Sequence, residues 1–317
     1  AGVARFDCDP LTGNSLGLLI EESRVNLLTY SSDFSNAVWL KTGATITTAA
    51  IVAPDGTQTG QSLVEDTSTG EHRLRVITIT KTSNQVLTYS VYVKPNGRYL
   101  QISMDNAGNG LYTIFDVLNN QYNNIAASAG WTRGQTSIVS VGDGVYRCII
   151  SGTTDTSLSV NVRITLATAF LGGANQNYTG DGYSGIFTWG AQLEAGSFAT
   201  SYIPTVASTV TRAADNASMT GTNFSSWWNQ SQGTMYVEYD TFGLATGYIF
   251  TISEGSGSVN YISLLKGISG LTNRFTTVST SVSQGNIDIG SISLNTNYKL
   301  IGSYITNNNN FCVNGGT

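Results

Sequence analysis

The stretch from Ile186 to Tyr202, IFTWGAQLEAGSFATSY, decides the fold class of this 317-residue chain. Its first half alternates, so that four apolar side chains are expected to share one face: Phe187, Trp189, Ala191 and Leu193. This two-residue period is typical of a β-strand with one buried face. Gly196 is expected to end the strand, and Pro204, which has no backbone N–H, marks an exit of the chain. The stretch is therefore predicted to be the closing strand of one domain, followed by a linker.

The sequence on either side repeats this pattern. Short alternating runs, of which Val86–Lys94 is the clearest, are separated by Gly, Asn, Asp and Ser turns about 8–12 residues apart, as in β-sandwiches. One helical turn is predicted within Asn26–Trp39, where Asp33 can cap it. No stretch keeps a 3.6-residue period, which disfavours crossover helices and a parallel sheet. The prediction is an all-β chain with two antiparallel β-sandwiches, the first of them a jelly roll.

Composition and charge narrow the class of function. Charged residues make up 11% of the chain, against about 25% in an average soluble protein, but 40% hydrophobic residues provide enough apolar surface for folded cores. The net charge of −5 comes with no basic stripe, so nucleic-acid binding is not expected. No run of 18 apolar residues occurs, so no membrane insertion is predicted.

Several segments together resemble a junction that recurs in bacteriophage tail-fibre and head-fibre (spike) proteins. They are RFDCDPLTGNSLGLLIEESRVNLL (Arg5–Leu28), GDGVYRCIISG (Gly142–Gly152), NYTGDGYSGIFTWGAQLE (Asn177–Glu194), and GAQLEAGSFATSYIPT with the STVTRAAD that follows it. In that family a carbohydrate-binding-module-like jelly roll precedes a concanavalin A-like lectin domain. The resemblance is close up to the linker and loose beyond it, and it is more specific for virion surface proteins than for any one ligand.

The resemblance implies an organisation and a role. Residues 1–25 would form an N-terminal segment with the first strand, 26–205 the jelly roll, and 206–317 a concanavalin A-like sandwich that is expected to be incomplete. The chain would lie on the virion surface, bind a host-surface glycan and other virion proteins, and self-associate, commonly as a trimer. Two alternatives stay open: a purely structural spacer or decoration of a phage head or tail, and an ancillary module of a secreted polysaccharide-degrading enzyme.

No constellation of residues predicts catalysis or a cofactor. The sole histidine, His72, has no recognisable nucleophile motif near it and is expected to pair with a neighbouring carboxylate. Glu238 and Asp240 share a strand face without a further acid, so glycoside hydrolysis is not predicted. Three distant cysteines and one histidine give no zinc pattern. A structural calcium near Glu194 is conceivable from the resemblance, but no second ligand supports it.

Glycan binding requires aromatic rings for the C–H faces of sugars and polar side chains for their hydroxyls. The candidate residues are aromatic and polar side chains of two predicted loops: Trp131, Arg133, Tyr178, Asp181 and Tyr183. Covering the edge of the sandwich is an equally good role for these loop aromatics. Trp39, Trp189 and Trp227 are expected instead to fill the cores.

Overall fold

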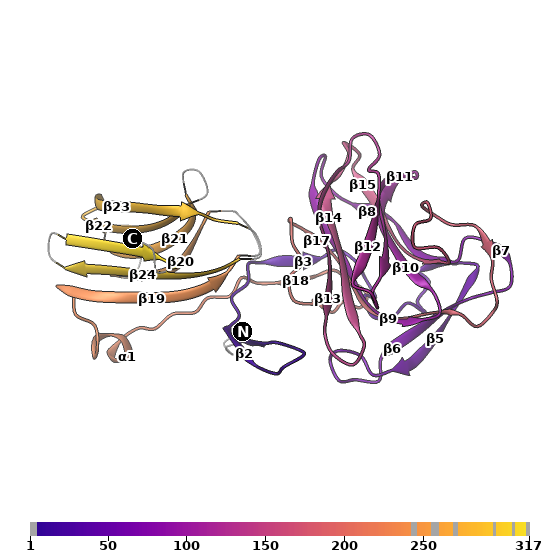
Figure 1. The fold of residues 1–317 in the computed structure, drawn as a ribbon, viewed down its shortest axis with the longest axis horizontal. Coiled ribbons are helices and arrows are strands. Elements are labelled where there is room, and N and C mark those ends of the chain that lie inside the picture. The colour runs from indigo at the N-terminus through magenta and orange to yellow at the C-terminus, as the bar shows by residue number, and fades with distance from the viewer. Residues whose placement is uncertain are drawn as a thin grey trace. The chain divides into compact units, whose positions relative to one another are not determined.

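The computed structural model describes residues 5–241, 246–254, 260–268, 272–293, 296–305 and 308–314. The chain divides into two compact units, Ala1–Ala217 and Ser218–Thr317, both built of antiparallel strands (Figure 1). The predicted all-β class is thus confirmed. The division lies after the 205/206 boundary expected from the sequence, because β18 (Val210–Arg212) still pairs with β3 (Arg24–Asn26) of the first unit.

Unit 1 contains two six-stranded sheets, ordered β12-β11-β10-β15-β8-β4 and β13-β14-β9-β17-β6-β5. We call them the first and the second sheet. The first sheet comprises β4 (Leu40–Thr42), β8 (Arg73–Thr80), β10 (Tyr99–Asn106), β11 (Asn109–Asp116), β12 (Gln121–Ile125) and β15 (Ser159–Ala167). The second comprises β5 (Ala44–Ile51), β6 (Gly60–Glu65), β9 (Val86–Asn96), β13 (Thr132–Ser140), β14 (Tyr146–Thr153) and β17 (Gly185–Ala195). Short pairs complete the unit: β1 (Phe6–Cys8) with β2 (Ser15–Leu18), β7 (Thr69–Gly70) with β16 (Tyr178–Thr179), and β3 with β18.

Eight of these strands follow the jelly-roll order. Labelled B to I along the chain, they are β6, β8, β9, β10, β11, β14, β15 and β17. They then read B-I-D-G in the second sheet and C-H-E-F in the first. The chain therefore passes back and forth between the sheets as two Greek keys, which is the jelly-roll arrangement predicted from the sequence.

The two sheets pack face to face around one core. Leu74, Ile102 and Ile164 of the first sheet and Tyr89 and Ile150 of the second are all fully buried in it. Their neighbours along each strand point outward, as the pleat requires. The core therefore needs no helical layer to cover it.

The segment predicted to hold a helical turn folds differently. Asn26–Trp39 forms turns without a helix, so that prediction was wrong. Asp33 does cap, but its Oδ1 accepts the backbone N–H of Ser35 within a turn (3.1 Å). Phe34 and Trp39 nonetheless reach the core and are fully buried, with their rings 4.9 Å apart in an edge-on contact.

Strand β17 carries a bulge that the sequence pattern did not reveal. Trp189 pairs with Tyr92 and Gln192 with Ser90, so two residues of β17 stand opposite one residue of β9. Gly190 supplies the positive φ (60°) of the bulge. Beyond the bulge, each side chain of β17 therefore points to the face opposite to the one that unbroken alternation from Trp189 would give.

The faces predicted for this strand were therefore right only in its second half. Ala191 and Leu193 lie in the main core, as expected, together with Ile186. Trp189, expected beside them, packs on the opposite face with Tyr92 in a separate cluster.

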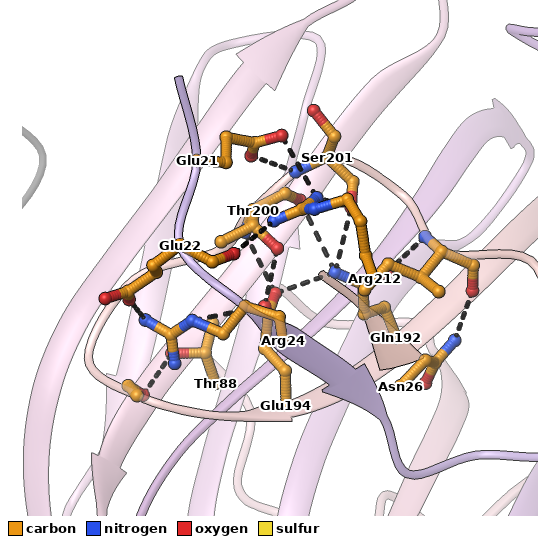
Figure 2. Close-up of polar contacts among 12 residues, drawn as sticks. Glu21, Glu22, Arg24, Asn26, Thr88, Gln192, Glu194, Thr200, Ser201 and Arg212 are labelled. Atoms are coloured by element: carbon orange, nitrogen blue, oxygen red, sulfur yellow. Dashed lines mark hydrogen bonds and ion pairs between the residues drawn. The ribbon is translucent and has the colours of Figure 1, made fainter. Parts of the chain in front are cut away.

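The outer face of β17 is covered by the residues that leave the strand. Gln192 and Glu194 point away from the core, yet both are fully buried. Figure 2 shows the Glu194 carboxylate accepting hydrogen bonds from Gln192 Nε2 (2.8 Å) and from the backbone N–H and hydroxyl of Thr200 (2.9 and 2.7 Å). Arg24 Nε lies 3.9 Å from Glu194 Oε2. The carboxylate considered as a calcium ligand thus serves as an acceptor within the protein.

A second group of contacts fastens the N-terminal segment to the linker. Arg212 Nη1 lies 3.0 Å from Glu21 Oε2, and Arg5 Nη1 lies 2.7 Å from the same oxygen. Arg5 also pairs with Asp215. The backbone N–H of Glu21 donates to Asp215 Oδ2 (2.8 Å), and that of Asp215 donates to the Glu21 carbonyl (2.8 Å). We call Arg5, Glu21, Arg212 and Asp215 the N-terminal clasp. The clasp joins the Arg5–Leu28 segment to the STVTRAAD segment, which are the first and the last of the segments that resemble fibre proteins. In this chain these two segments therefore form a structural junction.

Acid is expected to open the N-terminal clasp. The hydrogen bond from Arg5 lowers the pKa of Asp215. Burial acts to raise the pKa of Glu21, but hydrogen bonds from Ser201 and Arg5 and the charge of Arg212 lower it on balance. A carboxyl group whose pKa is depressed in the folded state stabilises the fold fully at pH values above its unfolded pKa of about 4. This stabilisation is lost as the pH falls below about 4 and through the lower folded-state pKa.

Hydrogen exchange of the Glu21 and Asp215 backbone N–H groups measures this opening. After correction for the intrinsic exchange rate, their protection should fall as pH drops below about 4, while that of Leu193 should persist. In an Asp215→Ala variant the Glu21 N–H should exchange faster already at neutral pH. Unchanged protection of Glu21 in that variant would contradict the role assigned to the clasp.

Unit 2 contains a one-turn helix and two further sheets. Helix α1 is a single turn at Thr222–Ser225. One sheet comprises β19 (Gln232–Asp240), β24 (Asn297–Ile305) and β25 (Asn308–Val313). The other comprises β20 (Gly247–Ser253), β21 (Tyr261–Ile268), β22 (Thr272–Ser279) and β23 (Val282–Ser291). The core of unit 2 contains residues of both sheets, among them Met235, Leu264, Phe275 and Leu300. The likeness of this unit to concanavalin A stays a prediction.

Candidate functional site

Two of the five predicted glycan-binding residues are structural. Trp131 is only 5% exposed and belongs to the main core of unit 1. Arg133 donates to the Thr113 hydroxyl (2.8 Å) and to the carbonyls of Tyr112 (2.9 Å) and Ile125 (3.0 Å). Arg133 thus ties β13 to two strands of the first sheet. Of the two roles left open for the Trp131 loop, the structure supports closing the sandwich edge.

Two of the other three predicted residues, Tyr178 and Asp181, come together around a buried carboxylate. Glu65 accepts hydrogen bonds from the Tyr178 hydroxyl (2.7 Å), from Arg98 Nε (2.8 Å) and from the Asp181 N–H (2.8 Å). Arg98 also binds Asp181 (2.9 Å). Tyr183, two residues further along, is 74% exposed. We call Glu65, Arg98, Tyr178 and Asp181 the loop brace.

The loop brace and the Trp131 loop lie at opposite ends of one strand. Arg98 immediately precedes β10. The Trp131 loop bonds through Ser128 to Gly110, which pairs with Asp105 near the end of β10. Six residues of strand separate these points by roughly 20 Å. The five predicted residues therefore do not form one site.

The loop brace holds a loop in place and has no free group for chemistry. The buried Glu65 is saturated by its donors, and Arg98 has its pKa raised by hydrogen bonding to Glu65. The pKa of Asp181 is lowered: burial opposes this, but hydrogen bonds from Ser184 and Tyr183 and the charge of Arg98 outweigh it. The loop that the brace holds presents Tyr183 to solvent.

His72 is enclosed behind this loop. Its ring is fully buried, with Nδ1 2.5 Å from the Gly43 carbonyl oxygen and Nε2 3.2 Å from that of Tyr178. The expected carboxylate partner is Asp66, whose Oδ1 lies 3.7 Å from Nδ1. The imidazole has no exposed surface through which it could reach a polymer, so its role here is to join two backbone segments.

Unit 2 contains an aromatic pocket that the sequence did not predict. The pocket has a volume of about 340 Å³, within the usual range for small-molecule sites. Its rim presents three aromatic rings, with Trp227 56%, Tyr236 59% and Phe250 40% exposed. Its floor is formed by the buried side chains of Met235 and Ile252. The expectation that Trp227 fills a core was therefore wrong.

Local contacts hold the pocket aromatics in place. The Trp227 indole donates to the Asn223 carbonyl (2.9 Å), and its ring lies 5.1 Å from that of Phe224. Phe224 stacks on Trp228 at 5.4 Å, and Trp228 lies 5.3 Å from Tyr304. The segment after the helical turn thus places two aromatic rings, Trp227 and Trp228, against Phe224. A preformed site of this kind loses little conformational entropy on binding.

The pocket also has polar groups that are free to bind a ligand. The side chains of Gln232 and Thr234 line it and have no hydrogen-bond partner among the residues that the structure describes. The side-chain amide of Asn229 is exposed beside them, although its oxygen already accepts from Ser231 (2.9 and 2.8 Å). None of the residues that line the pocket is charged. Free amide and hydroxyl groups beside exposed aromatic rings suit an uncharged, hydroxylated ligand.

The segment FSSWWNQ was the only available signal for this pocket. Two adjacent tryptophans cannot both point into one core from a regular element, so one of them had to face outward. Their local sequence does not say which one, or what lies opposite. Tyr236 and Phe250 come from two other strands, and only the folded chain brings them to Trp227.

Within the described parts of the chain, no three His, Cys, Asp or Glu side chains are placed to hold a metal ion. No described helix is long and apolar enough to span a membrane. No model of a known protein family matches the chain, and no curated protein matches it in sequence.

Proposed function

We propose that this chain is a surface protein of a phage-like fibre or spike, and that unit 2 binds an uncharged host-surface glycan through its aromatic pocket. The observation that carries the binding proposal is the open, uncharged pocket rimmed by Trp227, Tyr236 and Phe250. The virion setting rests on the resemblance of the Arg5–Leu28 and Ile186–Tyr202 segments to fibre proteins.

The physical support comes from the match between pocket and sugar. Exposed aromatic faces attract the C–H faces of a pyranose, and each good ring contact contributes about 1 kcal/mol. Gln232 and Thr234 offer donors and acceptors for hydroxyls. An anionic glycan would find no cation in the lining, and Glu238, which accepts from the Tyr236 hydroxyl (3.1 Å), would repel it. The pocket therefore favours neutral polymers over acidic ones.

The test is retention of the whole chain on a panel of neutral and acidic bacterial polysaccharides, followed together with polymer length. Retention on a neutral polymer of unchanged length is the expected result. It should persist at high salt, because no ion pair contributes to binding. Shortened polymer would instead indicate an enzyme.

Trp227→Ala is expected to weaken retention about tenfold, the equivalent of about 1.4 kcal/mol. The matched control is Tyr248→Ala, since Tyr248 is 65% exposed on β20 but does not line the pocket. Tyr183→Ala tests the site predicted in unit 1. A loss with Tyr183→Ala and none with Trp227→Ala would move the binding site to unit 1. No retention on any polymer would favour the structural-spacer alternative.

A further inference from the structure

A patch of arginines lies on the outer face of the first sheet of unit 1. Leu74, Val76 and Ile164 of β8 and β15 point into the core, so their neighbours Arg73, Arg75 and Arg163 point to the other face. Arg75 pairs directly with Arg163 across the two strands. Paired residues of antiparallel strands have Cα atoms only about 5 Å apart, so the three guanidinium groups share one small area.

Two carboxylates neutralise part of this charge. Arg163 binds Asp105 with both Nε (2.7 Å) and Nη2 (2.8 Å). Arg73 pairs with Glu71. Arg75 has no hydrogen bond or ion pair with any residue that the structure describes. Three arginines against two carboxylates leave one positive charge without a counter-ion in the protein.

Several buried donors on the same face also lack partners. The Nε atoms of Arg73 and Arg75 and the hydroxyls of Ser103 and Thr165 are buried and form no hydrogen bond among the described residues. The register places them together, because Thr165 pairs with Arg73 and Ser103 with Arg163. Buried donors are rarely left without an acceptor, so such a group calls for a ligand that accepts.

The electrostatic environment agrees with the geometry. Burial and the positive charges of Arg163 and Arg75 lower the pKa of Arg73 to about 10. Burial by itself disfavours the charged guanidinium, and the two neighbouring arginines add repulsion to that effect. An anion bound beside these groups would relieve that repulsion.

We propose that Arg73, Arg75 and Arg163 form a site for an oxyanion, a carboxylate or a phosphate group, on the outer face of this sheet. Guanidinium groups bind these planar or tetrahedral anions through paired N–H donors. Arg75 is half-buried, so it remains within reach of a ligand from solvent. A long polyanion does not fit, because one uncompensated charge on a chain of net charge −5 gives no basic track. The site is separate from the uncharged pocket of unit 2 and does not depend on its function.

The test is titration of the whole chain with sodium phosphate, sodium glucuronate or glucose at constant ionic strength, followed by thermal shift and NMR. Saturable binding of phosphate, glucuronate or both is expected, and none of glucose. Binding of glucuronate alone identifies a sugar acid as the ligand, whereas binding of phosphate alone identifies a phosphate group. Binding of neither would overturn the proposal.

Arg75→Met should weaken this binding at least about tenfold, because it removes charge-assisted hydrogen bonds. The variant should fold, since it removes a charge that has no partner in the protein. Arg75→Lys should give intermediate binding, because it keeps the charge but not the paired donors. Arg274→Met, which breaks the exposed Arg274–Asp288 pair (2.6 Å) of unit 2, is the matched control and should bind like the unmodified chain. Equal binding by Arg75→Met would also overturn the proposal.

Discussion

Glu194→Ala is expected to lower the free energy of unfolding of unit 1 by about 3–5 kcal/mol. The carboxylate is fully buried and accepts from Gln192 and from two donors of Thr200. Alanine would leave the two Thr200 donors without an acceptor, and a buried donor without a partner costs about 1–3 kcal/mol. It would also remove the acidic neighbour of Arg24, which is itself 8% exposed.

Calorimetry of the whole chain measures this effect with an internal control. The transition of unit 1 should move to lower temperature, while that of unit 2 should stay in place. Glu194→Gln, which keeps the shape and one acceptor, should cost about 1–2 kcal/mol. Glu22→Ala removes the other, more exposed carboxylate partner of Arg24 and should cost no more than about 1 kcal/mol. A shift for Glu194→Ala no larger than that for Glu22→Ala would show that the buried network contributes little.

Deletion of Gly190 is expected to leave unit 1 folded, with a regular strand in place of the bulge. The bulge lets Trp189 face outward while Ala191 and Leu193 face the core. Without the extra residue, Ala191 alone would stand opposite Val91, so simple alternation would keep Trp189 on the outer face and Leu193 in the core. Only the local contacts of the bulge would be lost, which is expected to cost about 1–2 kcal/mol, against a whole stability of about 5–15 kcal/mol of a domain.

Two further glycine variants separate register from local strain. Gly190→Ala keeps the residue count but places a Cβ at a φ of 60°, 3.0 Å from Tyr92 Cδ2, and should cost about 1–2 kcal/mol. Deletion of Gly173, which lies in a loop with no atom near its missing Cβ, should be tolerated. Near-ultraviolet circular dichroism of the three purified variants reports whether tertiary packing forms. A Gly190 deletion that fails to fold would show that the bulge itself is required, beyond the faces to which the side chains point.

The sequence predicted what repeats along the chain and missed what depends on distant residues. Period-two alternation and turn spacing are local, so they predicted the all-β class and the jelly roll correctly. The phase of one strand is not local: Gly190 in the sequence reads equally well as a small strand residue or as a bulge. Only pairing with Tyr92 and Ser90 of β9 shows which it is.

The candidate sites follow the same rule. Trp131 was chosen because glycines and polar residues surround it in AGWTRG, yet its ring is buried in the core. Trp227 was assigned to a core, yet its ring is on the surface beside side chains from two other strands. The arginine patch unites β8 and β15, which are separated in sequence by strands β9 to β14, and alternation alone cannot say which strands become neighbours.

The position of β17 within the second sheet has a consequence for synthesis of the protein. This strand joins β9 on one side and β6 on the other, and β6 holds β5. The hairpin of β5 and β6 is complete at Glu65, but β17, the strand that joins it to the rest of the sheet, is not complete until the ribosome has passed Ala195. At about 5–20 residues per second, the hairpin waits on the order of ten seconds. An isolated hairpin is marginally stable in water, so early strands of the nascent chain remain exposed to chaperones and proteases until their central partner emerges.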